Sequence, residues 1–235
     1  MKSPRLLAAL LIVFAFAAPA WAHFVWVAVQ PGADAKPTAH VWFSELAEPD
    51  SAELIDKIVA TKVWSRSADG KSQSVAVLKL VQDGGGALVG AVHAGTANLS
   101  AHIEYGVLTR GEKTFLLRYW AKYLDTSVSG WQTLARDEAL RLDVVPHTAA
   151  DGMTLEVLYA GQPASGSEVI ILDPTGAETT AKADASGKLK LVALRPGLYS
   201  IRAKWVVEEA GKLAEQAYPQ VNHYSTLALR VPPAK

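Results

Sequence analysis

Short apolar segments at regular spacing dominate the sequence and restrict the chain to a mostly β fold. Each segment is a short alternating or continuous apolar run, which is typical of strands. Turn residues separate them, as at Asp69-Gly70, Gly161-Gln162-Pro163 and Arg195-Pro196-Gly197. The predicted strands cover residues 24–29, 41–45, 62–66, 74–80, 87–92, 99–107, 114–119, 140–145, 154–159, 167–173, 188–194, 198–205 and 224–231. This pattern predicts sandwich-like sheets.

Three segments interrupt the strand pattern. Ser51 precedes a stretch at 52–58 with acidic residues in its early turns, which predicts a short helix capped by Ser51. Residues 122–138 are polar and include Trp131, which predicts a loop with one helical turn. The polar stretch 207–220 predicts a surface hairpin or insertion between the last two strands.

The N-terminus has the pattern of a secretory signal peptide over residues 1–22. A positive region precedes an apolar run at 6–18, which is too short for a comfortable membrane span. Small residues stand at both recognition positions before a cut after Ala22. We expect a periplasmic or secreted mature chain that begins at His23 and has no later membrane span, with an uncleaved anchor as the alternative.

A division into two domains is expected at residues 146–152, which have the composition of a linker. The expected units are an N-terminal β-rich domain at 23–146 and a β-sandwich domain at 147–235. Strands and turns alternate more regularly in the second unit, which favours an immunoglobulin-like or related sandwich there.

Composition excludes several classes of function. The 23 basic and 23 acidic residues give no net charge, which argues against a nucleic-acid partner. The absence of cysteine excludes disulfides, thiolate catalysis, iron–sulfur clusters and Cys-ligated zinc. Only Met1 and Met153 are methionines, so a Met-rich copper site is excluded. The chain also lacks the dinucleotide, phosphate-loop, zinc-protease and serine-hydrolase motifs, and we expect no enzymatic activity.

Histidines and carboxylates are therefore the candidate ligands for a divalent transition metal: nickel, cobalt, copper or zinc. Cleavage after Ala22 makes His23 the terminal residue, whose α-amine and ring Nδ1 can chelate one ion together. His223 is the expected partner, because alternation places it at the polar end of a strand face that is otherwise apolar. A hydrogen-bonded histidine at a domain seam is an equally good interpretation of His223.

Three further residues are weaker candidates for the metal site. Glu45 stands among apolar neighbours at a strand end, where a carboxylate needs a partner or a cation. His40 alternates with Trp42, so it faces away from Glu45 unless a bulge intervenes. His102 shares a strand face with Glu104, and a solvated face is the favoured interpretation there. The remaining two histidines are expected at the surface.

Four signatures follow one another in the second half of the chain: Gly161-Gln162-Pro163, Ser167-Glu168-Val169, Ala183-Asp184-Ala185-Ser186-Gly187-Lys188-Leu189 and Pro196-Gly197-Leu198-Tyr199. Together they resemble the transthyretin-like, or carboxypeptidase-regulatory, β-sandwich. Ala183 replaces the usual threonine and Leu189 the usual phenylalanine, which preserves both the turn and the inward packing. The resemblance covers about residues 152–206 and implies a spacer or binding module.

A second set of motifs spans the whole mature chain: His23-Phe24-Val25-Trp26, His40-Val41-Trp42-Phe43-Ser44-Glu45, Glu48-Pro49-Asp50, Tyr105-Gly106-Val107, Leu117-Arg118-Tyr119-Trp120-Ala121-Lys122, and Tyr218 with His223-Tyr224-Ser225-Thr226-Leu227. They are similar to a periplasmic family often described as nickel-uptake-associated. This resemblance implies a secreted metal-binding or metal-delivery protein and does not name the metal. We expect an accessory protein in nickel or cobalt uptake or handling, with a membrane metal transporter as its partner.

Two other functions stay open beside this metal-handling hypothesis. A copper oxygenase with a terminal histidine brace needs a second histidine opposite His23, for which His223, His102 and His40 are candidates. A metal-free sandwich that binds a glycan or another envelope protein predicts a tryptophan cluster exposed on one surface.

Overall fold

The computed structural model describes residues 23–32, 34–66, 71–82, 85–149, 152–192 and 194–233, so the predicted signal peptide lies outside the described part. The chain is mostly β, as predicted. The first strands are β1 (Phe24–Pro31), β2 (Pro37–Ser44), β3 (Asp50–Ser51), β4 (Lys62–Arg66), β5 (Ser72–Val75), β6 (Leu78–Gln82), β7 (Gly85–Ala91), β8 (Asn98–Arg110), β9 (Lys113–Asp125) and β10 (Leu142–Ala149). The later strands are β11 (Gly152–Tyr159), β12 (Gln162–Pro163), β13 (Glu168–Leu172), β14 (Glu178–Lys182), β15 (Lys188–Val192), β16 (Gly197–Val207), β17 (Gly211–Leu213), β18 (Gln216–Tyr218) and β19 (Val221–Val231). Two 3-10 helices are described, η1 (Ala52–Ile58) and η2 (Trp131–Leu134).

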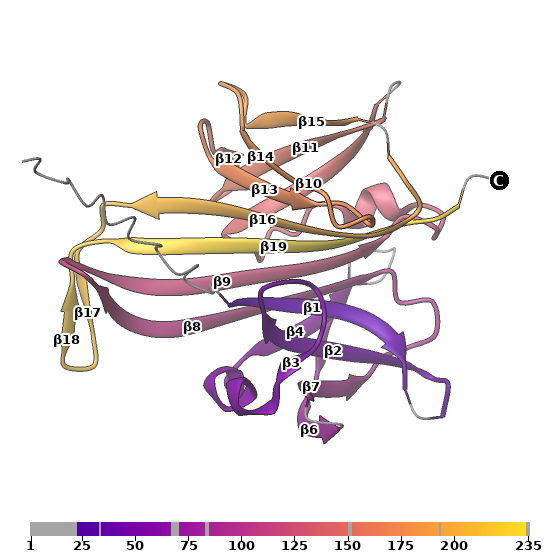
Figure 1. Cartoon of the computed structure of the whole chain (residues 1–235), viewed down its shortest axis with the longest axis horizontal. Coiled ribbons are helices and arrows are strands. Elements are labelled where there is room, and N and C mark those ends of the chain that lie inside the picture. The colour runs from indigo at the N-terminus through magenta and orange to yellow at the C-terminus, as the bar shows by residue number, and fades with distance from the viewer. Residues whose placement is uncertain are drawn as a thin grey trace, which may run out of the picture.

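An eight-stranded sheet runs through the middle of the molecule (Figure 1). Its strand order is β14-β13-β16-β19-β9-β8-β4-β5. Neighbouring strands are antiparallel except β19 and β9, which run parallel although they are far apart in sequence. Strands from both sides of the expected boundary at residue 146 therefore belong to one sheet, and the two-domain division stays a prediction.

Smaller sheets cover the two faces of this central sheet (Figure 1). A five-stranded sheet, β1-β2-β7-β3 with β6 on β7, lies on one face. A four-stranded sheet, β10-β11-β12 with β15 on β11, lies on the other. The molecule is thus a layered, sandwich-like β structure, in agreement with the predicted fold class. No helix among the described residues is long and apolar enough to cross a membrane.

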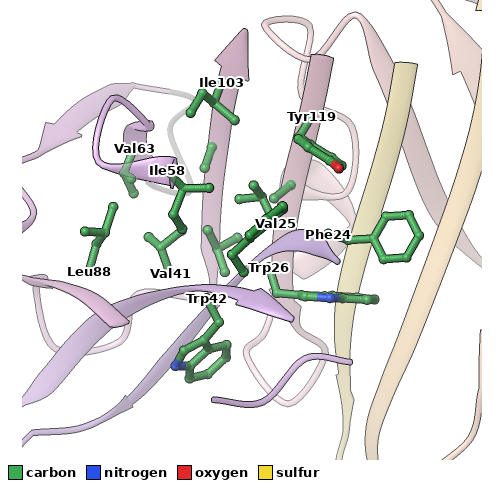
Figure 2. Close-up of a cluster of buried hydrophobic side chains, with 14 of the residues drawn as sticks. Phe24, Val25, Trp26, Val41, Trp42, Ile58, Val63, Leu88, Ile103 and Tyr119 are labelled. Atoms are coloured by element: carbon green, nitrogen blue, oxygen red, sulfur yellow. The ribbon is translucent and has the colours of Figure 1, made fainter. Parts of the chain in front are cut away.

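Alternation along β9 divides the apolar residues into two cores. Tyr119 belongs to the first core, together with Trp26 and Val41 of the five-stranded sheet (Figure 2). Trp120 belongs to the second core, where it packs with residues such as Leu155 of the four-stranded sheet. Because successive side chains of a strand point to opposite faces, one strand supplies both cores.

Two local predictions need correction. Within the predicted linker at 146–152, the described residues 146–149 and 152 belong to strands β10 and β11, in which Pro146 pairs with Leu155. Proline is tolerated there because β10 is an edge strand. Ser51 stands at the predicted N-cap of η1 but makes no side-chain capping bond, and it also belongs to β3, where it pairs with Gly85.

Other segments follow the sequence pattern more closely. The hairpin expected within residues 207–220 is formed by β17 and β18, and the helical turn expected near Trp131 is η2. The strand predicted at 74–80 is instead divided between β5 and β6, which belong to different sheets. β14 was not predicted, because its sequence Glu-Thr-Thr-Ala-Lys is polar and mostly exposed at the edge of the central sheet.

Candidate functional site

His23 is held by residues from three different segments. Its ring packs against Phe43 of β2, with 5.6 Å between ring centroids. Its backbone carbonyl accepts a hydrogen bond of 2.9 Å from the Tyr119 hydroxyl of β9. Ring Nε2 lies 3.3 Å from the Asp50 carboxylate of β3. The side chain is 21% exposed, so the ring is fixed in place and still open to solvent.

The contact with Asp50 distinguishes the two nitrogens of the His23 ring. A carboxylate beside Nε2 favours the hydrogen on that nitrogen and leaves the lone pair on Nδ1. No hydrogen bond among the described residues engages Nδ1. Nδ1 is also the ring nitrogen nearer to the backbone nitrogen of the same residue. The two atoms can bind one metal ion together when the backbone nitrogen is a free amine.

His223 lies on the opposite face of the central sheet. Tyr119 of β9 contacts His23, whereas the next residue, Trp120, contacts His223. Consecutive residues of a strand point to opposite faces, so the sheet separates the two histidines. The structure therefore does not bring together the pair that the sequence favoured.

The hydrogen bonds of His223 fix its tautomer. The side chain is fully buried, and Trp120 Nε1 donates to its Nδ1 at 3.0 Å. An indole N–H can only donate, so Nδ1 is the acceptor and Nε2 carries the hydrogen. Nε2 lies 3.4 Å from the Tyr159 hydroxyl, which also accepts from Arg141 Nε at 3.0 Å. Neither ring nitrogen of His223 then has a free lone pair for a metal.

His102 belongs to the same cluster. Its ring stacks on Trp120, with 3.9 Å between centroids and 20° between planes, and its Nε2 is buried without a described partner. Burial lowers the pKa of His102 to about 4 and that of His223 to about 3, so both rings are neutral at neutral pH. Glu104 is exposed on the same strand and pairs with Arg118 at 2.7 Å.

His40 and Glu45 make no described contact with either of these sites, although Glu45 directly follows Ser44, the residue that pairs with Phe24. The His40 ring packs on Trp42, with 5.7 Å between centroids, and burial lowers its pKa. The backbone carbonyl of Glu45 accepts from Arg202 Nη1 at 3.2 Å. Glu45 also lines a small cavity with Glu168 and Arg202.

Among the five candidate ligands, the described contacts bring together only His102 and His223, which both contact Trp120. No group of three or more histidine, aspartate or glutamate side chains suited to a metal occurs among the described residues. No described histidine contacts His23, which leaves the proposed copper brace without its second histidine among these residues. Sequence reasoning did not assign Asp50 as the partner of His23, because the short strand β3 that carries it has no periodic signal.

A buried ionic cluster in the second core was also missed. Lys122 Nζ contacts the Asp143 carboxylate and the Ala135 carbonyl, and the Lys122 and Asp143 side chains are only 1% and 3% exposed. The backbone N–H of Asp137 donates to Asp143 at 2.9 Å. Burial raises the pKa of the Asp143 carboxyl. The available signal was a lysine that alternates with Trp120 on a core-facing strand.

Asp137 connects this cluster to the central sheet. Its carboxylate accepts hydrogen bonds from Trp64 Nε1 of β4 at 2.9 Å and from Ser100 Oγ of β8 at 2.7 Å. Both carboxylates in this core are therefore held by fixed donors.

No protein-family model matches the chain, and no curated protein matches it. The transthyretin-like and nickel-uptake resemblances therefore stay predictions.

Proposed function

We propose that the chain is an exported, non-enzymatic protein that binds a divalent transition metal at His23 and assists the uptake or handling of nickel or cobalt. The observation that carries the proposal is the orientation of the His23 ring. Its Nε2 faces Asp50, and its Nδ1 stays available beside the backbone nitrogen. Removal of residues 1–22 turns that nitrogen into an amine and completes a two-nitrogen donor set.

The donor set fits a metal ion that is bound and then released. Amine and imidazole nitrogens suit nickel, cobalt, copper and zinc, and copper is the strongest binder of these by intrinsic affinity. Asp50 keeps the hydrogen on Nε2 and adds negative charge beside the ion. With only two protein nitrogens, the remaining positions are left to water or to a donor from a partner. This favours transfer to a membrane transporter over storage.

The chain itself contributes position and charge. Phe43 and the Tyr119 hydroxyl fix the ring and the backbone of His23, so little conformational freedom is lost when an ion binds. The ring and the amine must both be deprotonated to bind, so affinity rises with pH through the range where the amine titrates.

Equilibrium dialysis of the mature, exported protein against nickel, cobalt, copper and zinc, with elemental analysis, tests the proposal. We expect stoichiometric binding that is lost in His23→Ala and weakened in Asp50→Asn. His93→Ala is the matched control, since His93 is an exposed histidine in a turn. Equal binding by His23→Ala and His93→Ala would overturn the site, and no binding by the unmodified protein would overturn the function.

One observation favours the metal-free alternative, a module that binds another envelope protein. β6 is paired only with β7 among the described strands, and it exposes Leu78, Leu80 and Val81 by 76%, 42% and 52%. Exposed apolar residues on a sheet edge are a common docking feature. The glycan form has less support, because every described tryptophan is buried or half-buried. If Leu78→Lys abolishes a protein contact in an envelope extract and metal binding is absent, this alternative is the better account.

A further inference from the structure

We propose that Lys122 and Asp143 condense in the folded protein to form an intramolecular amide bond between their side chains. The bond joins β9 of the central sheet to β10 of the four-stranded sheet. It is independent of the metal site, because it lies in the second core on the face of the central sheet away from His23.

The two reacting groups are held in contact and shielded from water. Lys122 Nζ contacts Asp143 Oδ1, and neither side chain is more than 3% exposed. Lys122 lies two residues from both Trp120 and Leu124 on β9, and both of these neighbours belong to the second core. Fixed proximity of this kind makes an intramolecular reaction far faster than the same reaction in solution.

Burial also favours the protonated, reactive form of the Asp143 carboxyl, because it raises the pKa of that group. An ammonium and a carboxylate lose their hydration in such a core, and their mutual attraction repays only part of the cost. Asp137, whose carboxylate lies nearby, adds negative charge that raises the pKa of Asp143 further. Transfer of one proton within the pair gives a neutral amine and a carboxylic acid, which are the forms that condense.

The polar groups around the pair match an amide better than an ion pair. The Lys122 ammonium has three N–H donors. The described residues offer it two acceptors, Asp143 and the carbonyl of Ala135. An amide has one N–H and one carbonyl oxygen. The Ala135 carbonyl is already placed to accept from that N–H, and the Asp137 backbone N–H already donates to Oδ2 of Asp143.

The step balances without any co-reactant. A proton passes from Lys122 Nζ to Asp143 Oδ1, and the Nζ lone pair then attacks Cγ to form the C–N bond. Negative charge gathers on Oδ2, where the Asp137 backbone N–H stabilises it. A second proton moves from the nitrogen to Oδ1, the C–Oδ1 bond breaks, and one water molecule leaves. The product is a neutral amide that retains one N–H.

Mass spectrometry of the mature protein with its natural sequence tests the bond directly. We expect an intact mass about 18 Da below the calculated value, the mass of one water. We also expect a tryptic product in which the Lys122 and Asp143 peptides are joined. Lys212 and Glu215, an exposed ion pair at 2.8 Å, serve as an internal control and stay unlinked.

Two variants separate the bond from a simple buried ion pair. Asp143→Ala should show its full calculated mass, because it has no carboxyl group. Asp143→Asn should form the same amide by releasing ammonia, and so lose about 17 Da. The proposal would be overturned if the folded protein of natural sequence had its full calculated mass and gave separate Lys122 and Asp143 peptides. Partial linkage that increases with time after purification supports it.

Discussion

Acidification below pH 6.5 should destabilise the protein through His223. Burial lowers the pKa of this ring to about 3 in the folded state, against 6.5 in the unfolded chain. The unfolded chain therefore binds a proton first as the pH falls. The stability contributed by neutral His223 is complete above pH 6.5 and is lost progressively toward pH 3. At pH 5 the loss from this residue alone is about 2 kcal/mol of unfolding free energy.

The structure gives the reason for this sensitivity. Nδ1 of His223 accepts a hydrogen bond from the Trp120 N–H. A proton on Nδ1 occupies the lone pair that accepts this bond and repels the indole hydrogen. Nearby cationic groups, Arg118 and Arg141, further disfavour a charged ring. A protonated His223 therefore loses its hydrogen bond and places a charge in the second core.

Urea unfolding at several pH values between about 7.5 and 4.5 measures the effect. His223→Gln is the reference, because its amide can accept from Trp120 and donate to Tyr159 but does not titrate. Between pH 6 and pH 4.5 the unmodified protein should lose about 1.2 kcal/mol per pH unit relative to this variant. His102 is present in both proteins, so its own titration cancels. Parallel stability curves for the two proteins would refute the reasoning.

Three further predictions follow from named contacts. Trp120→Phe removes the only described donor to His223 Nδ1 and should cost about 1–3 kcal/mol in urea unfolding at pH 7.5, whereas an unchanged midpoint would contradict the assigned tautomer. Leu155→Ala leaves a cavity in the second core and should cost about 2–5 kcal/mol in the same assay, and a loss below about 1 kcal/mol would argue against the packing described. Asp50→Asn should lower metal affinity about tenfold in competition titrations, and an affinity equal to that of the unmodified protein would remove Asp50 from the site.

The strands were largely predictable, because period-two alternation and turn residues are local signals. The arrangement of the sheets was not. Alternation tells which residues share a face of a strand, but not which strand lies beside it or which layer covers it. The parallel pairing of β19 with β9 joins residues about a hundred positions apart, and no turn between them encodes it.

The same limit explains the outcome for the candidate site. The sequence identified His23 and His223 as unusual residues, and each does occupy a constrained position. Which face of the central sheet each one meets depends on the order of the central strands, so their separation could not be deduced. Asp50 reaches His23 only because β3 pairs with β7, through two residues in each strand. Lys122 was assigned to the predicted loop at 122–138, whereas it lies on β9, which continues to Asp125, so its contact with Asp143 was not foreseen.

The measurement that tests the central claim most directly compares metal binding by two forms of the mature protein. One form begins at His23, and the other carries a single alanine before it, so that the backbone nitrogen becomes an amide. We predict stoichiometric nickel or cobalt binding by the first form and a large loss in the second, with the same fold in both. Equal binding by the two forms would contradict a chelate at the His23 terminus.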